Sequence, residues 1–76
     1  MTETNTEEVV ALVASVLNLP DGVVGADASM ESLPKWDSMA HLNICLAFQE
    51  RFGVVLDMET IASSTSVAKL AALLPN

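Results

Sequence analysis

The residues best suited to chemistry lie together in one stretch, "KWDSMAHL" (35–42). This stretch holds the only tryptophan and the only histidine of the chain, on either side of an Asp-Ser pair. Apolar residues at helical spacing follow it, so the serine stands at the head of the most apolar segment. Any chemistry of this stretch therefore depends on what a serine can do at the start of a helix.

One reading of this stretch is a serine nucleophile activated by a histidine. Ser38 and His41 are three residues apart, which places them on neighbouring positions of one helix. A hydrolase also needs an oxyanion hole and a residue that orients the histidine, and the sequence has no pattern for either. A chain of 76 residues cannot readily enclose a substrate. The sequence therefore predicts a protein that is not an enzyme.

A second reading is an attachment point for an anionic group. Asp37 is a good N-cap, which places Ser38 in the first helical turn. Free backbone N–H groups and the positive end of the helix dipole favour an anion there, so a phosphate ester on Ser38 would be stabilised. The alternative is that Asp37 and Ser38 are only a capping pair.

Charge limits the partners that the chain can have. Ten acidic residues stand against three basic ones, Lys35, Arg51 and Lys69, and the formal net charge is -7. This charge disfavours nucleic acid and anionic membranes and favours basic protein partners, although it could also serve solubility alone. We expect a monomer that binds neither nucleic acid nor membrane.

Cysteine usage and the N-terminus indicate the compartment. Cys45 is the only cysteine, which rules out an internal disulfide, and one His with one Cys cannot supply a metal site. The acidic start "MTETNTEE" is unlike a signal peptide, and no apolar run approaches the roughly 20 residues of a membrane span. We expect a cytoplasmic, stand-alone protein with no metal and a single domain over residues 1–76.

The apolar spacing predicts an all-α fold of four helices. A capping box of Thr4 and Glu7 would start the first helix, and Pro20 would stop it. Asp37 and Gly53 would bound the second helix. The helices are expected over about 5–18, 38–52, 57–62 (a short one) and from Thr65 or Ser66 to 74, with a long loop over 23–36. Residues expected to face inward from the loop and the last helix are Val23, Val24, Met30, Leu33, Trp36, Leu70, Leu73 and Leu74.

The second helix carries two apolar stripes. At about 100° per residue, its expected core face consists of His41, Ile44, Cys45, Phe48 and Phe52. Met39, Leu42 and Leu46 form another stripe, about 140° away. This stripe either packs on the loop and the third helix or forms a contact surface for a partner, which an exposed methionine favours.

The segment "WDSMAHLNICLAFQERFGVVL" resembles the acyl carrier protein family, the phosphopantetheine-binding fold. It is similar to the family's Asp-Ser-Leu/Met motif with the apolar second helix and the Phe-Gly turn. The first helix, the long loop, the short third helix and the final "STSVAKLAALL" match in order, so the resemblance covers almost the whole chain.

The resemblance implies a cofactor, partners and roles for site residues. Ser38 would carry 4′-phosphopantetheine, transferred from coenzyme A by a magnesium-dependent phosphopantetheinyl transferase, and Asp37 would help to position that enzyme and its metal. Met39, Leu42 and Leu46 would form the docking surface. The further partners would be an acyl- or aminoacyl-loading enzyme and the downstream synthase or transferase enzymes, which supply the catalytic groups while the arm holds the cargo as a thioester.

Departures from the family pattern bear on the pathway. Fatty-acid carriers have a strongly acidic second helix, which Asn43, Gln49 and Arg51 dilute here, and "PKWDS" lacks the paired glycines of peptidyl carriers. The form resembles free-standing carriers of polyketide, nonribosomal peptide or modified acyl and aminoacyl assembly; the alternatives are a fatty-acid carrier and an unmodified helical interaction module.

The core-facing residues bear on the cargo. Ile44, Phe48 and Ile61 are candidate pocket-lining residues. His41 is expected at the edge of the core near the helix start, with a pocket-lining role as the alternative. In carriers that sequester long chains, the positions of His41 and Phe48 tend to be smaller, so the resemblance implies poor sequestration of a long acyl chain.

Overall fold

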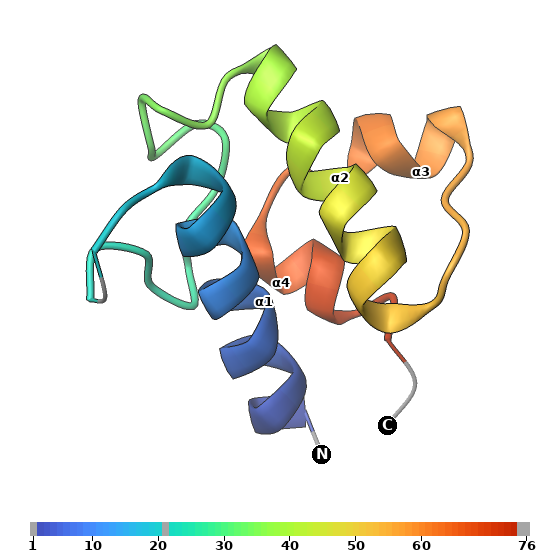
Figure 1. Ribbon diagram of the computed structural model, residues 1–76, viewed down its shortest axis with the longest axis horizontal. Helices are drawn as coiled ribbons and strands as arrows, with labels where there is room; N and C mark the ends of the chain where they lie inside the picture. The colour runs from blue at the N-terminus through green and yellow to red at the C-terminus, as the bar shows by residue number, and fades with distance from the viewer. Residues whose placement is uncertain (1, 21, 75–76) are drawn as a thin grey trace.

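The computed structural model describes residues 2–20 and 22–74, with the side chains of residues 2–4 left aside. Within these ranges the elements are four helices and no strand, which confirms the expected all-α fold (Figure 1). The helices are α1 (Thr2–Leu17), α2 (Ser38–Phe52), α3 (Met58–Ser63) and α4 (Val67–Ala71). Across the described residues, no helix has the length and apolar character that a membrane span needs.

Helix α1 differs from its expected bounds at both ends. It begins at Thr2, two residues before the expected cap at Thr4, so the predicted capping box is wrong. Nothing in "TETN" stops a helix, since the segment contains neither Pro nor Gly. At the other end, Asn18 adopts a left-handed conformation (φ 56°) and the Leu19 N–H donates to the Ala14 carbonyl at 2.9 Å. This Schellman-type cap ends α1 before Pro20 is reached.

Helix α2 has the bounds that the sequence predicted. Asp37 is its N-cap, in an extended conformation, and its carboxylate accepts the Ala40 N–H. Gly53 adopts a left-handed conformation (φ 65°) and its N–H donates to the Gln49 carbonyl, so it has the expected role of ending the helix. Both ends of α2 are therefore set by short-range chemistry.

The core forms where α1, α2 and α4 meet. Fully buried side chains come from all three helices: Val9, Val13, Ile44, Phe48, Val67 and Leu70 are each 0% exposed. Each such valine, leucine or phenylalanine contributes roughly 1.5–3 kcal/mol to the free energy of folding. Leu73 is 36% exposed, so its expected inward orientation is wrong. The reason is that α4 stops at Ala71, and the N–H groups of Leu73 and Leu74 bond to carbonyls three residues back, which tightens the turn.

The long loop between α1 and α2 packs against the core and is tied to the start of α4. Met30 N–H donates to the Thr65 carbonyl at 2.9 Å, and Val67 N–H donates to the Ala28 carbonyl at 3.0 Å. Val24 and Trp36 are buried, as expected. Val23 is 49% exposed, so its expected packing is wrong. Two hydrogen bonds and two buried anchors thus hold the segment that leads into α2.

Helix α3 depends on its cap and on its neighbours. Asp57 is its N-cap, and its carboxylate accepts the Thr60 N–H at 2.8 Å. That hydrogen bonding lowers the pKa of the Asp57 carboxyl below its ordinary value. All six residues of α3 are described, and none of them is buried. A helix this short is not stable by itself in water, so contacts with the rest of the protein must hold it.

Candidate functional site

Ser38 is the first residue of α2, and its side chain is exposed. The Asp37 Oδ1 atom accepts the Ala40 N–H, and the Asp37 carbonyl accepts the His41 N–H, both at 2.8 Å. Helix geometry leaves the N–H groups of Ser38 and Met39 without intrahelical acceptors. The Ser38 hydroxyl therefore lies at a helix end that favours an attached anion, as the sequence predicted.

A buried chain of hydrogen bonds lies directly beneath this site. The Trp36 Nε1–H donates to His41 Nδ1 at 3.0 Å. Because Nδ1 accepts this bond, the proton of the neutral ring is on Nε2, which donates to the Ile61 carbonyl at 2.6 Å. Both ring nitrogens are thus engaged away from Ser38, so this arrangement does not provide a base for a serine nucleophile.

Three of the four residues expected to line a pocket are buried. His41, Ile44 and Phe48 are 5%, 0% and 0% exposed, and Ile61 is half-buried. The structure brings His41 and Ile61 into direct contact through the hydrogen bond described above. His41 therefore lies within the core rather than at its edge. His41, Ile44 and Phe48 therefore belong to the buried face of α2.

Cys45 lies in the same buried layer. Its Sγ atom is 3.6 Å from His41 Nε2, and burial raises the pKa of the thiol, which keeps it protonated and a poor nucleophile. No group of three or more His, Cys, Asp or Glu residues in the described part of the chain could hold a metal ion. Ser38 is thus the one reactive side chain that this region exposes together with a helix end.

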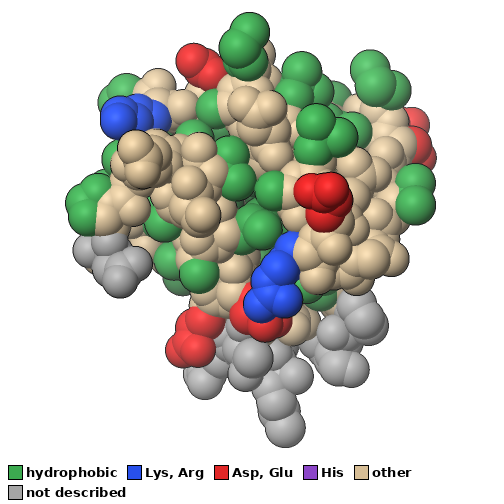
Figure 2. All heavy atoms as spheres, viewed as in Figure 1, with side chains coloured by type: hydrophobic (Ala, Val, Ile, Leu, Met, Phe, Trp, Pro, Cys, Tyr) green, Lys and Arg blue, Asp and Glu red, His purple; other side chains and the backbone are tan. Residues whose placement is uncertain are grey.

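An exposed apolar band borders the site. Met39, Leu42 and Leu46 are 74%, 52% and 61% exposed, so the second stripe of α2 faces solvent rather than the loop or α3. The band continues beyond α2 with two residues that sequence reasoning missed, Val55 and Met58, which are 93% and 80% exposed. Hydrophobic side chains gather over the upper part of the face in Figure 2, where Figure 1 places the start of α2 and α3.

Met58 carried a signal that could have identified it. Met58 is the first residue after the Asp57 cap of α3. Met39 is the second residue after the Asp37 cap of α2, so both methionines lie in the first turn of a capped helix. We define the apolar band as Met39, Leu42, Leu46, Val55 and Met58. Exposed apolar side chains on two adjacent elements are typical of a contact surface.

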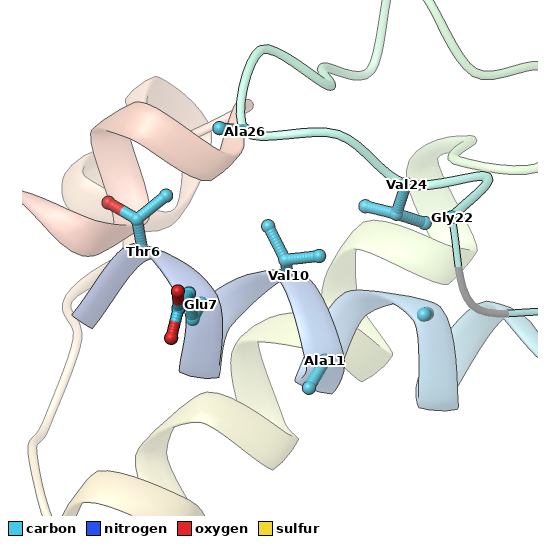
Figure 3. Close-up of a pocket in the computed structure, with 8 residues that line it drawn as sticks. Thr6, Glu7, Val10, Ala11, Gly22, Val24 and Ala26 are labelled. Atoms are coloured by element: carbon cyan, nitrogen blue, oxygen red, sulfur yellow. The ribbon is translucent and has the colours of Figure 1, made fainter. Parts of the chain in front are cut away.

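Several shallow hollows lie in the described surface, and two of them concern the site and the loop. One, of about 500 Å³, lies beside Ser38 and includes Leu17, Lys35, Met39 and Asn43 in its lining. The other, of about 350 Å³, lies between α1 and the loop, where Val10 faces Val24 and Ala26 (Figure 3). Neither hollow is lined by the residues that were expected to form an acyl pocket, within the part of the chain that the structure describes.

The residues that dilute the acidity of α2 have structural partners. Arg51 pairs with Glu8 of α1 at 3.2 Å, across an exposed contact that contributes little to stability. The Gln49 side-chain oxygen accepts the Leu56 N–H at 2.8 Å and so ties the segment before α3 to α2. Asn43 is exposed. The acidic side chains on or beside α2 are few, namely Asp37 and Glu50, whereas Asp57 and Glu59 lie beside Met58 on α3.

Comparison with known proteins identified one family. The family model described as a phosphopantetheine attachment site matches residues 7–74, a range that includes Ser38 and all of α2, α3 and α4. Neither the curated proteins nor the solved structures gave a significant match.

The cap at Asp37 can be tested separately from any role of its charge. Asp37→Ala removes the acceptor for the Ala40 N–H, so we expect a loss of about 1 kcal/mol in the free energy of unfolding. Asp37→Asn caps a helix nearly as well and should lose only a few tenths of that amount. Urea unfolding at neutral pH measures both variants, and equal losses in the two would contradict the capping role.

Proposed function

The chain belongs to the phosphopantetheine attachment site family, and we propose that it carries acyl or aminoacyl intermediates on a 4′-phosphopantetheine arm attached to Ser38. The prosthetic group of this family is covalently attached 4′-phosphopantetheine, and its members are carriers rather than catalysts. The observation that carries the proposal is the exposed Ser38 at the first position of α2, inside the matched range.

The residues at this position fit the group. A phosphodiester on Ser38 would lie next to the N–H groups that α2 leaves unpaired, at the positive end of its dipole. The Asp37 carboxylate already accepts the Ala40 N–H, so it is turned toward the helix. The bound group supplies a thiol on a flexible arm, which holds cargo as a thioester. A tethered cargo also has a raised effective concentration at each partner enzyme.

This chain's own residues position the arm and present a surface. The Asp37 cap fixes the start of α2, and the buried face of α2 holds the helix on the core, so Ser38 keeps one place relative to the apolar band. The band would receive the phosphopantetheinyl transferase, the loading enzyme and the downstream synthase or transferase enzymes. Asp37 would also help to position the transferase and its magnesium ion, a role that the family resemblance supports.

The pathway that fits best is a specialised one, of polyketide or nonribosomal type. Support comes from the diluted acidity of α2. Gln49 and Arg51 stand where a more acidic helix would have carboxylates for a basic partner, and both form contacts within the fold. Docking would then depend more on the apolar band than on ion pairs. A carrier for fatty-acid synthesis is the alternative within the same chemistry.

Attachment at Ser38 is tested by intact-mass measurement. After incubation with coenzyme A, magnesium and a broad-specificity phosphopantetheinyl transferase, we expect the mass to rise by one phosphopantetheine. Ser38→Ala should abolish the gain, whereas Ser15→Ala, at an exposed position on α1, should keep it. No gain with any transferase would favour an unmodified interaction module and would overturn the carrier proposal.

Cargo exposure is tested by thermal unfolding of the loaded protein. Because His41, Ile44 and Phe48 are buried in the core, we expect the dodecanoyl-loaded and acetyl-loaded forms to have midpoints within about 2 °C of each other. A sequestered acyl chain would bury several methylenes at about 0.8 kcal/mol each. The unfolding midpoint of the dodecanoyl-loaded form would then exceed that of the acetyl-loaded form by more than about 5 °C.

A control variant shows how large the midpoint difference becomes when the core has room for an acyl chain. Phe48→Ala opens space in the core, so its dodecanoyl-loaded form should gain stability over its acetyl-loaded form. If the dodecanoyl-loaded form of the protein without substitutions had a much higher unfolding midpoint than its acetyl-loaded form, the acyl chain would enter the core and the expectation would be wrong.

A further inference from the structure

Helix α3 is attached to α2 by few contacts, and one of them is a side-chain cap. Figure 1 shows α3 beside the N-terminal half of α2. The Ser64 N–H bonds to the Thr60 carbonyl, whereas the Ile61 carbonyl, in the last turn of α3, receives the His41 Nε2–H at 2.6 Å. Carbonyls in the last turn of a helix lack intrahelical donors. His41 supplies that donor from another helix.

The other side of the His41 ring is fixed as well. Its Nδ1 atom accepts from the indole of Trp36, which is 1% exposed, and the two rings stack with centroids 6.0 Å apart. Trp36 immediately precedes Asp37, the cap of the helix that begins at Ser38. One imidazole therefore connects the residue before the cap to the last turn of α3.

We propose that His41 is a positioning residue, which holds α3 and the Met58 end of the apolar band in a fixed place relative to Ser38. The inference rests on the proposed function, since it is the modification of Ser38 that needs this geometry. Met58 is 80% exposed on an element with no buried residue among its six described ones, so its place depends on how α3 is held. A partner that contacts both Met39 and Met58 requires the two helices in one arrangement.

Packing alone does not explain the imidazole. A leucine would fill similar volume at a buried position, but it would leave the buried indole N–H and the Ile61 carbonyl without partners. The two hydrogen bonds form a short buried network, and such networks favour one arrangement of the groups that they join. The Gln49 side chain accepts the Leu56 N–H and so holds the segment just before α3 on α2. His41 bonds to Ile61, in the last turn of α3, and so holds the opposite end of that helix.

Hydrogen exchange of the full-length chain tests whether His41 holds α3. In His41→Leu, we expect the amides of Ile61 and Ser64, both hydrogen-bonded within the α3 segment, to exchange at least about tenfold faster than in the unmodified sequence. His41→Gln, which can both donate and accept, should restore part of the protection. Val13→Ala is the matched control because it weakens the core on α1, away from α3.

Transferase kinetics test whether this geometry matters for Ser38. With the same transferase and coenzyme A, at a temperature where circular dichroism shows every variant folded, we expect His41→Leu to raise KM about fivefold and to leave kcat unchanged. His41→Gln should recover part of the KM. Val13→Ala, although destabilised, should keep the KM of the unmodified sequence.

The outcomes separate this inference from the proposed function. Unchanged exchange of the α3 amides in His41→Leu overturns the anchoring of α3. Faster exchange with an unchanged KM overturns the role of that anchoring in docking, and so does an equal rise of KM in Val13→Ala. Failure of the unmodified sequence to accept phosphopantetheine overturns the proposed function itself, while the exchange result still decides whether His41 anchors α3.

Discussion

The register of α2 is the constraint on which the rest of the structure depends. The hydrogen bond from the Ala40 N–H to Asp37 Oδ1 helps to start the helix at Ser38, and the start decides which side chains face the core. With this start, His41, Ile44, Cys45 and Phe48 are buried. The same register leaves Ser38 at the exposed helix end and Met39 and Leu42 in solvent. One local interaction thus separates the packed face from the face that is available for chemistry.

The buried face of α2 also bears on the cargo that the proposed carrier could hold. An imidazole bonded at both nitrogens and a fully buried Phe48 occupy core positions that, by the family resemblance, tend to hold smaller residues in carriers that sequester long chains. A carrier built in this way would leave its cargo in reach of partner enzymes instead of sheltering it. That property suits short or polar cargo, since a long apolar chain left in water has an unfavourable free energy of hydration.

The parts of the fold governed by short-range chemistry were predictable from the sequence. The bounds of α2, its two caps and its buried face follow from an Asp, a Gly and a 3.6-residue spacing. The start of α1 was not predictable because "TETN" is compatible with both helix and coil. Leu73 and Val23 were misplaced because their exposure depends on how the last turn of α4 and the loop close, which spacing does not encode.

The candidate site was predictable at Ser38 and Asp37 and less so around them. Their positions follow from the cap. The helical projection separates Met39, Leu42 and Leu46 from the core face but left open whether they pack on the loop and α3, and the structure shows them exposed. The hydrogen bond between His41 and Ile61 links residues 20 positions apart in the sequence, and only the placement of α3 beside α2 brings them together. Val55 was missed because no helical spacing places it, whereas Met58 could have been identified from its position after the Asp57 cap.

The central claim is that Ser38 is the residue that carries the prosthetic group. Its most direct test is fragmentation mass spectrometry of the protein isolated from its native host while the pathway that uses it is active. We expect the phosphopantetheine to be located on Ser38, in the peptide that spans residues 36–51. Protein that is unmodified throughout, or that carries the group on a different serine, would contradict the account.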